Sequence, residues 1–228
     1  MGLIDFLFPK KCVNCGKFGG YVCKSCQVGL WEEEQICPIC TRNSRYGLPH
    51  KYCHKAYGLD GLTCFWAYDG VAKKIIKKVK YRYFYDVLRE LIVNSSEFRD
   101  RPEFSYLAKF LEMKPIIVPV PLNEKRYRER GFNQADVIGR AFAARHKLAF
   151  DSHLLLRTRD TGHQAGRTRA ERLLALENSM KIVNCKLKIP QAILLVDDVW
   201  TTGATMSECC RVLKIAGVKR VWGLVLAR

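Results

Sequence analysis

The first quarter of the chain contains two groups of four potential metal ligands, each built from pairs of residues separated by two positions. Such pairs place two thiolates, or a thiolate and an imidazole, on one ion, as tetrahedral zinc requires. Four protein ligands leave no open coordination position, so the predicted role of the metal is structural. The predicted ligands are Cys12, Cys15, Cys23 and Cys26 for one zinc ion and Cys37, Cys40, His50 and Cys53 for the second.

The spacing of these residues leaves alternatives open. Either group could be free thiols or contain a disulfide, and the pairs could interleave between two ions. The start of the chain lacks the pattern of a secretory signal, and disulfides are rare in the cytosol, which favours metal binding. The remaining cysteines lie in apolar or helical patterns and are predicted to be core residues: Cys64, Cys185, Cys209 and Cys210.

A second candidate site follows an apolar run at residues 192–196, where Asp197 and Asp198 precede a turn of small and hydroxylated residues and then a helical pattern up to residue 215. The apolar run is typical of a strand buried on both faces. A strand, a small-residue turn and a helix N-terminus bind anions, because free N–H groups and the helix dipole point into the turn. The pattern predicts a phosphate in the turn, with the carboxylates on vicinal hydroxyls or a hydrated magnesium ion. The predicted phosphate-binding residues are Thr201, Thr202, Gly203, Ala204 and Thr205.

A nucleoside triphosphatase also has a strand that ends in acidic residues. Such an enzyme needs the motif G-x-x-x-x-G-K-[ST], which the sequence lacks. The turn therefore predicts a phosphate monoester site of another kind.

These sites require a folded framework, and the composition is typical of a globular protein. The chain has 228 residues, of which 48% are hydrophobic and 27% charged, which excludes wholesale disorder and collagen-like or coiled-coil structures. No apolar run approaches the ~20 residues that span a bilayer, so we expect a cytoplasmic protein without membrane insertion. The net charge is +17, of which +3 lies in residues 1–60 and +14 in residues 61–228.

Part of this positive charge is concentrated in one stretch without acidic residues, where aromatic residues follow or interleave. Positive charge follows a phosphate backbone and aromatic faces stack on unpaired bases, so the combination favours single-stranded nucleic acid. The simpler interpretation is a solvated helix face, with Val71, Ile75, Ile76 and Val79 turned toward the core. The predicted nucleic-acid residues are Lys73, Lys74, Lys77, Lys78, Lys80 and Arg82.

Residues 194–205 resemble the phosphoribosyl pyrophosphate (PRPP) motif of type I phosphoribosyltransferases. With FLFPKKCVNCG at 6–16, VPVP at 118–121 and RGFNQA at 130–135, the chain is similar to the ComF/GntX (ComFC-like) family of bacterial competence-associated proteins. The resemblance implies an α/β fold of the type I phosphoribosyltransferase class, a Rossmann-like parallel sheet with flanking helices. This domain would occupy residues 59–228, after a double zinc ribbon-like module at residues 1–58.

In similar transferases, two acidic residues bind the ribose hydroxyls, the turn binds the 5′-phosphate, and Mg²⁺ accompanies PRPP. The resemblance places a pyrophosphate-binding loop after the strand at 116–121, although a solvated basic loop is the alternative. It also makes residues 157–172 a flexible catalytic loop, with one departure at Ala175, where the family usually has Asn. The implied catalytic residues are Asp197, Asp198, Arg126, Arg130, Gln164 and Arg172.

Two functions follow from this resemblance. One is a protein of DNA uptake in natural transformation that binds PRPP or a nucleotide phosphate and single-stranded DNA, with a competence helicase as a possible partner. The other is an active phosphoribosyltransferase of nucleotide metabolism or salvage without a direct DNA role. The sequence does not identify an acceptor for the transfer.

Overall fold

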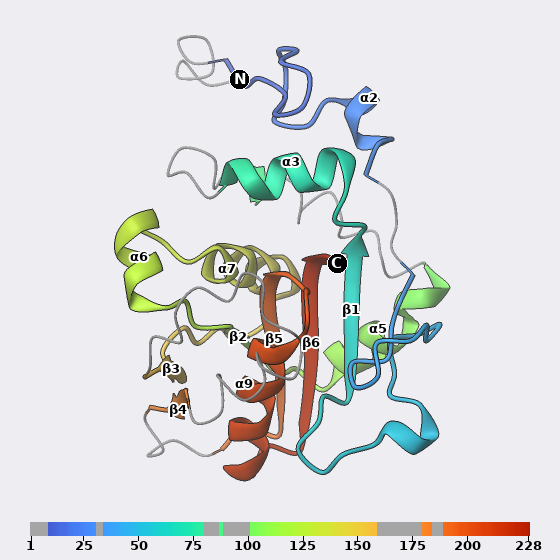
Figure 1. Cartoon of the computed structure of the whole chain (residues 1–228), viewed down its shortest axis with the longest axis vertical. Helices are drawn as coiled ribbons and strands as arrows, with labels where there is room; N and C mark the ends of the chain where they lie inside the picture. Colours follow the sequence, from blue (N-terminus) through green and yellow to red (C-terminus); the bar gives the residue numbers. More distant parts are fainter. Residues whose placement is uncertain (1–8, 31–33, 80–86, 89–100, 159–178, 184–188) are drawn as a thin grey trace.

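The computed structural model describes residues 9–30, 34–79, 87–88, 101–158, 179–183 and 189–228. Within them, a parallel sheet is formed in the order β1-β6-β5-β2, by β1 (Gly61–Trp66), β6 (Arg220–Ala227), β5 (Ala192–Val199) and β2 (Ile116–Pro119). An antiparallel pair lies beside it, consisting of β3 (Leu155–Arg157) and β4 (Met180–Ile182). Figure 1 shows the sheet at the centre of the molecule, with the N-terminal segment beyond one end.

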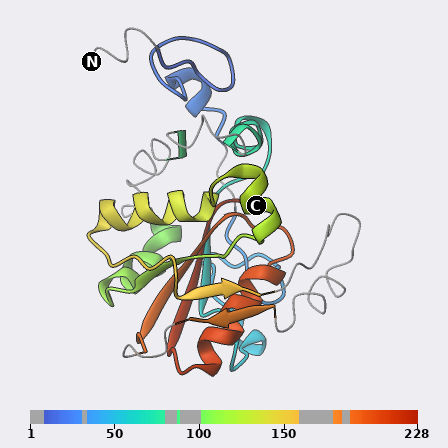
Figure 2. The ribbon, with the colours of Figure 1, turned by 90° about the vertical axis from the view of Figure 1, so that its left-hand side faces the viewer.

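Helices cover both faces of the sheet, as the apolar run of β5 requires. Leu194 and Val196 pack in one cluster with residues of α3 (Gly70–Val79), α5 (Ser105–Glu112) and α7 (Gln134–His146). Ile193 and Leu195 face the opposite cluster, which contains residues of α9 (Ala204–Ile215), β3 and β4. Figure 2 shows these layers from the side. The predicted α/β class, with a strand buried on both faces, is confirmed.

The N-terminal region folds as two similar turns around cysteine pairs. We call residues 9–30 the first ribbon and residues 34–57 the second ribbon. The first ribbon contains the short helix α2 (Lys24–Gln27), and the second contains a 3-10 turn at Lys51–Cys53. Figure 1 shows the first ribbon above α3 and the second beside β1.

The first ribbon shares a hydrophobic cluster with α3, because Val13 and Val22 pack in the cluster that contains Val71 and Ile75. The N-terminal region therefore contributes to the main core. The domain division after residue 58 stays a prediction.

Cys64, Cys209 and Cys210 are fully buried, the first in β1 and the others in α9. These positions fit the predicted core role. Burial is the main reason that the pKa of Cys210 is raised to about 12, so this thiol stays protonated. Cys185 lies outside the described residues. Within the described part of the chain, no helix has the length and apolar character needed to cross a bilayer.

Candidate functional site

Two carboxylates lie at the carboxyl end of β5. Asp197 Oδ1 accepts a hydrogen bond from the backbone N–H of Asp198 at 2.9 Å. Burial, followed by the negative charge of Asp198, raises the pKa of Asp197 well above its ordinary value, while the positive charge of Arg157 acts in the opposite direction. Hydroxyl donors or a cation would relieve this concentration of negative charge, so the pair suits a polyhydroxylated or metal-bound ligand.

The turn after these carboxylates depends on one glycine. Gly203 has φ +73°, and a Cβ atom there would lie 2.1 Å from the ring of the buried Trp200, so no other residue fits without rearrangement. The turn leads into α9, with Gly203 as its N-cap, and encloses a cavity of about 40 Å³. Residues of the predicted PRPP motif line this cavity: Asp197, Thr201, Thr202, Gly203, Ala204 and Thr205.

Arg130 is brought near the carboxylates from a different segment. It ends α6 (Glu124–Arg130), after which Gly131 adopts a left-handed conformation. Burial lowers the pKa of Arg130, with a smaller contribution from Arg126, and the charges of Asp198 and Asp197 oppose this shift. Of the two predicted arginines, Arg130 therefore lies within electrostatic reach of the carboxylates, and Arg126 lies within reach of Arg130.

Sequence reasoning assigned no role to Gln134, at the first position of α7. Its Oε1 accepts a hydrogen bond from Arg130 Nη1 at 3.0 Å, and the residue is only 3% exposed. Its Nε2 atom is buried without a partner within the described residues. Gln134 therefore holds the Arg130 guanidinium while retaining a donor. Gln134 is part of the RGFNQA motif, but the motif does not predict its contact with Arg130, because that contact depends on how α6 and α7 meet.

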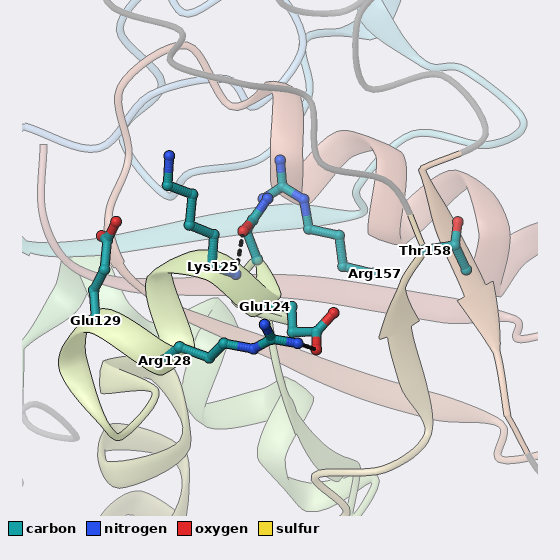
Figure 3. Close-up of a pocket in the computed structure, with 7 residues that line it drawn as sticks. Glu124, Lys125, Arg128, Glu129, Arg157 and Thr158 are labelled. Atoms are coloured by element: carbon teal, nitrogen blue, oxygen red, sulfur yellow. Dashed lines mark hydrogen bonds and ion pairs between the residues drawn. The ribbon is translucent and has the colours of Figure 1, made fainter.

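A larger pocket of about 550 Å³ lies between α6 and β3 (Figure 3). Figure 3 shows Lys125 entering from α6 and Arg157 from β3, with both charged ends on the same side. Arg128 pairs with Glu124 on the exposed side of α6. The loop expected to meet pyrophosphate thus lines a pocket with three cationic and two acidic side chains, although Arg126 and Arg130 are not among its lining residues. Its lining residues are Asn123, Glu124, Lys125, Arg128, Glu129, Arg157 and Thr158.

Asn123 serves a structural purpose in this loop. Its Oδ1 accepts hydrogen bonds from the backbone N–H groups of Lys125 (2.7 Å) and Arg126 (3.4 Å), so it caps α6. The position of Arg157 could not be anticipated from the sequence, because β3 is only three residues long and shows no periodicity. Gln164 and Arg172, the other predicted catalytic residues, lie outside the described residues.

The first group of predicted zinc ligands is gathered in one place. Ligand atoms of Cys12, Cys15, Cys23 and Cys26 lie within 4.8 Å of one another, and the sulfur atoms of Cys15 and Cys23 are 3.6 Å apart. A zinc ion with Zn–S bonds of about 2.3 Å needs edges of about 3.8 Å, so this geometry fits tetrahedral zinc. The four thiols come from consecutive pairs, so the pairs do not interleave.

The second group has the same compactness. Ligand atoms of Cys37, Cys40, His50 and Cys53 lie within 4.8 Å of one another. His50 Nδ1 is 3.3 Å from Cys40 Sγ and 3.9 Å from Cys53 Sγ. Its Nε2 is 2.9 Å from the Asn43 carbonyl oxygen; donation there leaves Nδ1 free of a proton, as a metal ligand must be.

The thiol pKa values in both groups favour a bound cation. The backbone N–H of Arg42 is the main cause that lowers the pKa of Cys40 to about 6. Burial, together with hydrogen bonds from Cys40 and Cys37, raises the pKa of Cys53 to about 11. In the first group, burial raises the pKa of Cys12 but backbone N–H groups lower it to about 6. One thiolate thus forms readily in each group, and a full set requires a positive ion.

The predicted nucleic-acid residues divide into three sets. Lys74 Nζ donates to Asn14 Oδ1 at 2.9 Å, and Lys78 Nζ donates to the Val13 carbonyl at 2.7 Å, so both contact the first ribbon. Lys77 is exposed on the same helix, and Lys73 Nζ lies 5.8 Å from the centre of the Tyr68 ring. Lys80 and Arg82 lie outside the described residues.

Tyr68 connects α3 to the carboxylates. Burial raises the pKa of Tyr68, and the negative charge of Asp198 adds to the shift. Because Lys73 stands over the Tyr68 ring, the basic helix and the candidate phosphate site are neighbours.

Comparison with known proteins agrees with the two predicted zinc ribbons and with the resemblance to competence proteins. A family described as the double zinc ribbon domain matches residues 3–57. ComFC, a competence protein of Streptococcus pneumoniae, is 27% identical over 86% of this chain and 81% of its own length. Competence protein F of Haemophilus influenzae is 33% identical over 51% of this chain and 52% of its own length. DNA utilization protein YhgH of Escherichia coli is 33% identical over half of each chain.

The chain thus spans about half the length of the Haemophilus and Escherichia proteins. The parallel α/β sheet, the two ligand groups and these similarities agree with one another. The chain is therefore similar to proteins of competence and DNA utilization, and its N-terminal region matches a double zinc ribbon whose two ligand groups suit structural zinc.

Proposed function

We propose that this chain binds PRPP with Mg²⁺ at the end of β5, binds single-stranded DNA through α3, and acts in DNA uptake during natural transformation. The observation that carries the PRPP assignment is the convergence of Asp197, Asp198 and Arg130 beside the turn at 201–205. The competence proteins among its relatives support the cellular role.

In this proposal the ribose hydroxyls of PRPP donate to the carboxylates of Asp197 and Asp198. The backbone N–H groups of residues 201–205 bind the 5′-phosphate, assisted by the N-terminus of α9. Pyrophosphate lies toward Arg130 and Lys125, whose positive charges stabilise its oxygens. Mg²⁺ neutralises part of the pyrophosphate charge when it is bound, and the carboxylates supply the oxygen ligands that this ion prefers.

Single-stranded DNA would follow the positive charge of α3, where Lys77 is exposed. The arrangement favours a DNA role over nucleotide salvage alone, because α3 carries four lysines and no acidic residue. Its proximity to Asp198 through Tyr68 would place a bound strand near PRPP. A transferase that acts on free bases has no need of this helix charge.

Calorimetric titration of PRPP with Mg²⁺ tests the assignment. The double variant Asp197→Ala/Asp198→Ala should show no measurable binding, because the ribose acceptors are lost. Glu112→Gln, an exposed change in α5, should bind like the wild type. Unchanged affinity in the double variant would show that PRPP does not bind at this position.

Release of pyrophosphate from PRPP with a panel of free bases, but no effect of single-stranded DNA, would favour the salvage enzyme.

The variant Asp197→Asn separates loss of binding from loss of folding. The native pKa of Asp197 is raised, so its ionised form destabilises the folded state, and a neutral amide should raise the Tm at pH 7. The increase should be present above the unfolded pKa of about 3.9 and vanish below it, where the wild-type carboxyl is protonated in both states. Weaker PRPP binding with an unchanged or higher Tm then reflects the site itself.

A further inference from the structure

The first ribbon carries positive charge that neither zinc nor PRPP explains. Residues 9–30 contain four lysines and no acidic residue. Zinc with four thiolates carries a net charge of −2, so the ribbon stays positive when the metal is bound. The lysines are all exposed: Lys10, Lys11, Lys17 and Lys24.

Aromatic rings accompany these lysines. Phe18 is 65% exposed, and the Lys11 ammonium lies 4.9 Å from its ring centre. Lys10 lies 5.1 Å from the ring centre of Tyr21. An exposed phenylalanine contributes little to packing in a small zinc ribbon, whereas its face can stack on an unpaired base. Cations beside such rings are suited to the phosphates that flank a stacked base.

This surface continues onto α3. Lys74 and Lys78 donate hydrogen bonds to Asn14 and Val13 of the first ribbon, and Val13 shares the hydrophobic cluster of α3. Figure 1 shows the ribbon lying along the helix on the side away from the sheet. The ribbon is thus held against α3, and it supplies an exposed aromatic ring that α3 lacks.

We infer that the first ribbon is a single-strand binding surface in its own right, in which Phe18 stacks on a base and Lys10, Lys11 and Lys17 contact phosphates. This inference rests on the proposed function, because it extends the α3 site onto the zinc ribbon. A zinc ion bound by the first ligand group would then also fix the turn that presents Phe18. Single-stranded nucleic acid is the ligand because an unpaired base offers the face that a ring requires.

Fluorescence anisotropy with a labelled single-stranded oligonucleotide, over a series of salt concentrations, tests this inference. Lys10→Gln/Lys11→Gln/Lys17→Gln should weaken binding at least about tenfold at low salt and reduce the salt slope by about 2. The matched control Lys51→Gln/Lys55→Gln/Lys109→Gln removes equal charge elsewhere and should bind like the wild type.

The aromatic contact is tested separately. Phe18→Ala should weaken binding about tenfold without changing the salt slope, and Phe18→Trp should restore it, because a larger ring stacks at least as well. Tyr52→Ala is the matched control, since Tyr52 is a 94% exposed ring on the second ribbon. Zinc content and Tm should stay at wild-type values in every variant.

Each outcome is informative. If the wild type binds no single strand, the proposed DNA role fails. If the wild type binds and Lys77→Glu weakens it, but the Lys10, Lys11 and Phe18 variants bind normally, only the present inference is overturned. Anionic lipid vesicles provide a further arm. Loss of vesicle binding with unchanged DNA binding in the ribbon variants would make this surface a membrane contact and overturn the inference.

Discussion

The two zinc ribbons have nearly the same local structure but very different surroundings. In each, the residue after the second cysteine of the pair has a left-handed backbone, Gly16 at φ 77° and Thr41 at φ 63°. Its N–H donates to the carbonyl of the first cysteine, at 2.8 Å to Cys12 and 2.9 Å to Cys37. This turn brings the two thiols of a pair together, and in the second ribbon a threonine adopts a conformation that usually favours glycine.

The second ribbon is built into the edge of the sheet. The Gln35 side chain donates to the Cys64 carbonyl at 2.7 Å and accepts from the Cys64 N–H at 2.9 Å. The Leu62 N–H donates to the Gly47 carbonyl at 2.9 Å, and Ile36 is buried in the core. The ribbon therefore satisfies backbone groups that the edge strand β1 would otherwise leave unpaired.

The first ribbon contacts α3 through Lys74, Lys78 and apolar packing at Val13, and Phe18 stays exposed. The difference shows that the same cysteine-pair turn can either cover the edge of a sheet or carry an exposed surface. Which role it takes depends on what the flanking residues contact.

Removing each zinc site in turn gives the largest expected contrast. Cys37→Ser/Cys40→Ser should abolish cooperative unfolding of the sheet, because the edge of β1 loses its cover when the ribbon unfolds. Cys12→Ser/Cys15→Ser should lower the Tm, because Val13 and Val22 pack in the main core, but should retain a cooperative transition of the sheet. Thermal unfolding followed by tryptophan fluorescence checks this, since Trp222 lies in β6, and metal analysis should find one zinc per chain fewer in each variant. Equal effects would show that the ribbons have equivalent structural roles.

Gln35→Leu tests the hydrogen bonds that join the second ribbon to β1. Gln35 is 4% exposed, so the substitution removes two buried hydrogen bonds to the backbone of Cys64, at a cost of about 3 kcal/mol in unfolding free energy. Asn14→Leu, which removes a polar side chain of the first ribbon, should cost less than about 1 kcal/mol. Chemical denaturation measures both, and an equally small effect at Gln35 would contradict the structural difference between the ribbons.

Lys78→Met should give the smallest effect, below about 1 kcal/mol, since only one hydrogen bond, to Val13, is lost and the Lys78 residue is exposed. Hydrogen exchange should accelerate in residues 9–30 but not in β1. Lys77→Met, an exposed position on the same helix, is the control and should leave both regions unchanged. Faster exchange in the second ribbon as well would show that the two ribbons are coupled.

Several elements could be predicted because their causes are local. The apolar run before Asp197 is a buried strand, the helix after Gly203 ends at the expected residue 215, and α3 buries the four apolar positions predicted for it. Both ligand groups are brought together as their spacing suggested. The contacts of Arg130 with Gln134 and the position of Arg157 were not predictable, because they arise where α6, α7 and β3 meet.

The sequence by itself determined the residue types at each site, because a metal turn and a phosphate turn each depend on a few adjacent residues. Only the tertiary structure decided how those turns are used. It placed the second ribbon against β1 and left Phe18 of the first ribbon exposed. It also directed Lys74 and Lys78 toward the first ribbon. The physical reason is that hydrogen bonds and burial between distant segments depend on packing, which short-range spacing does not specify.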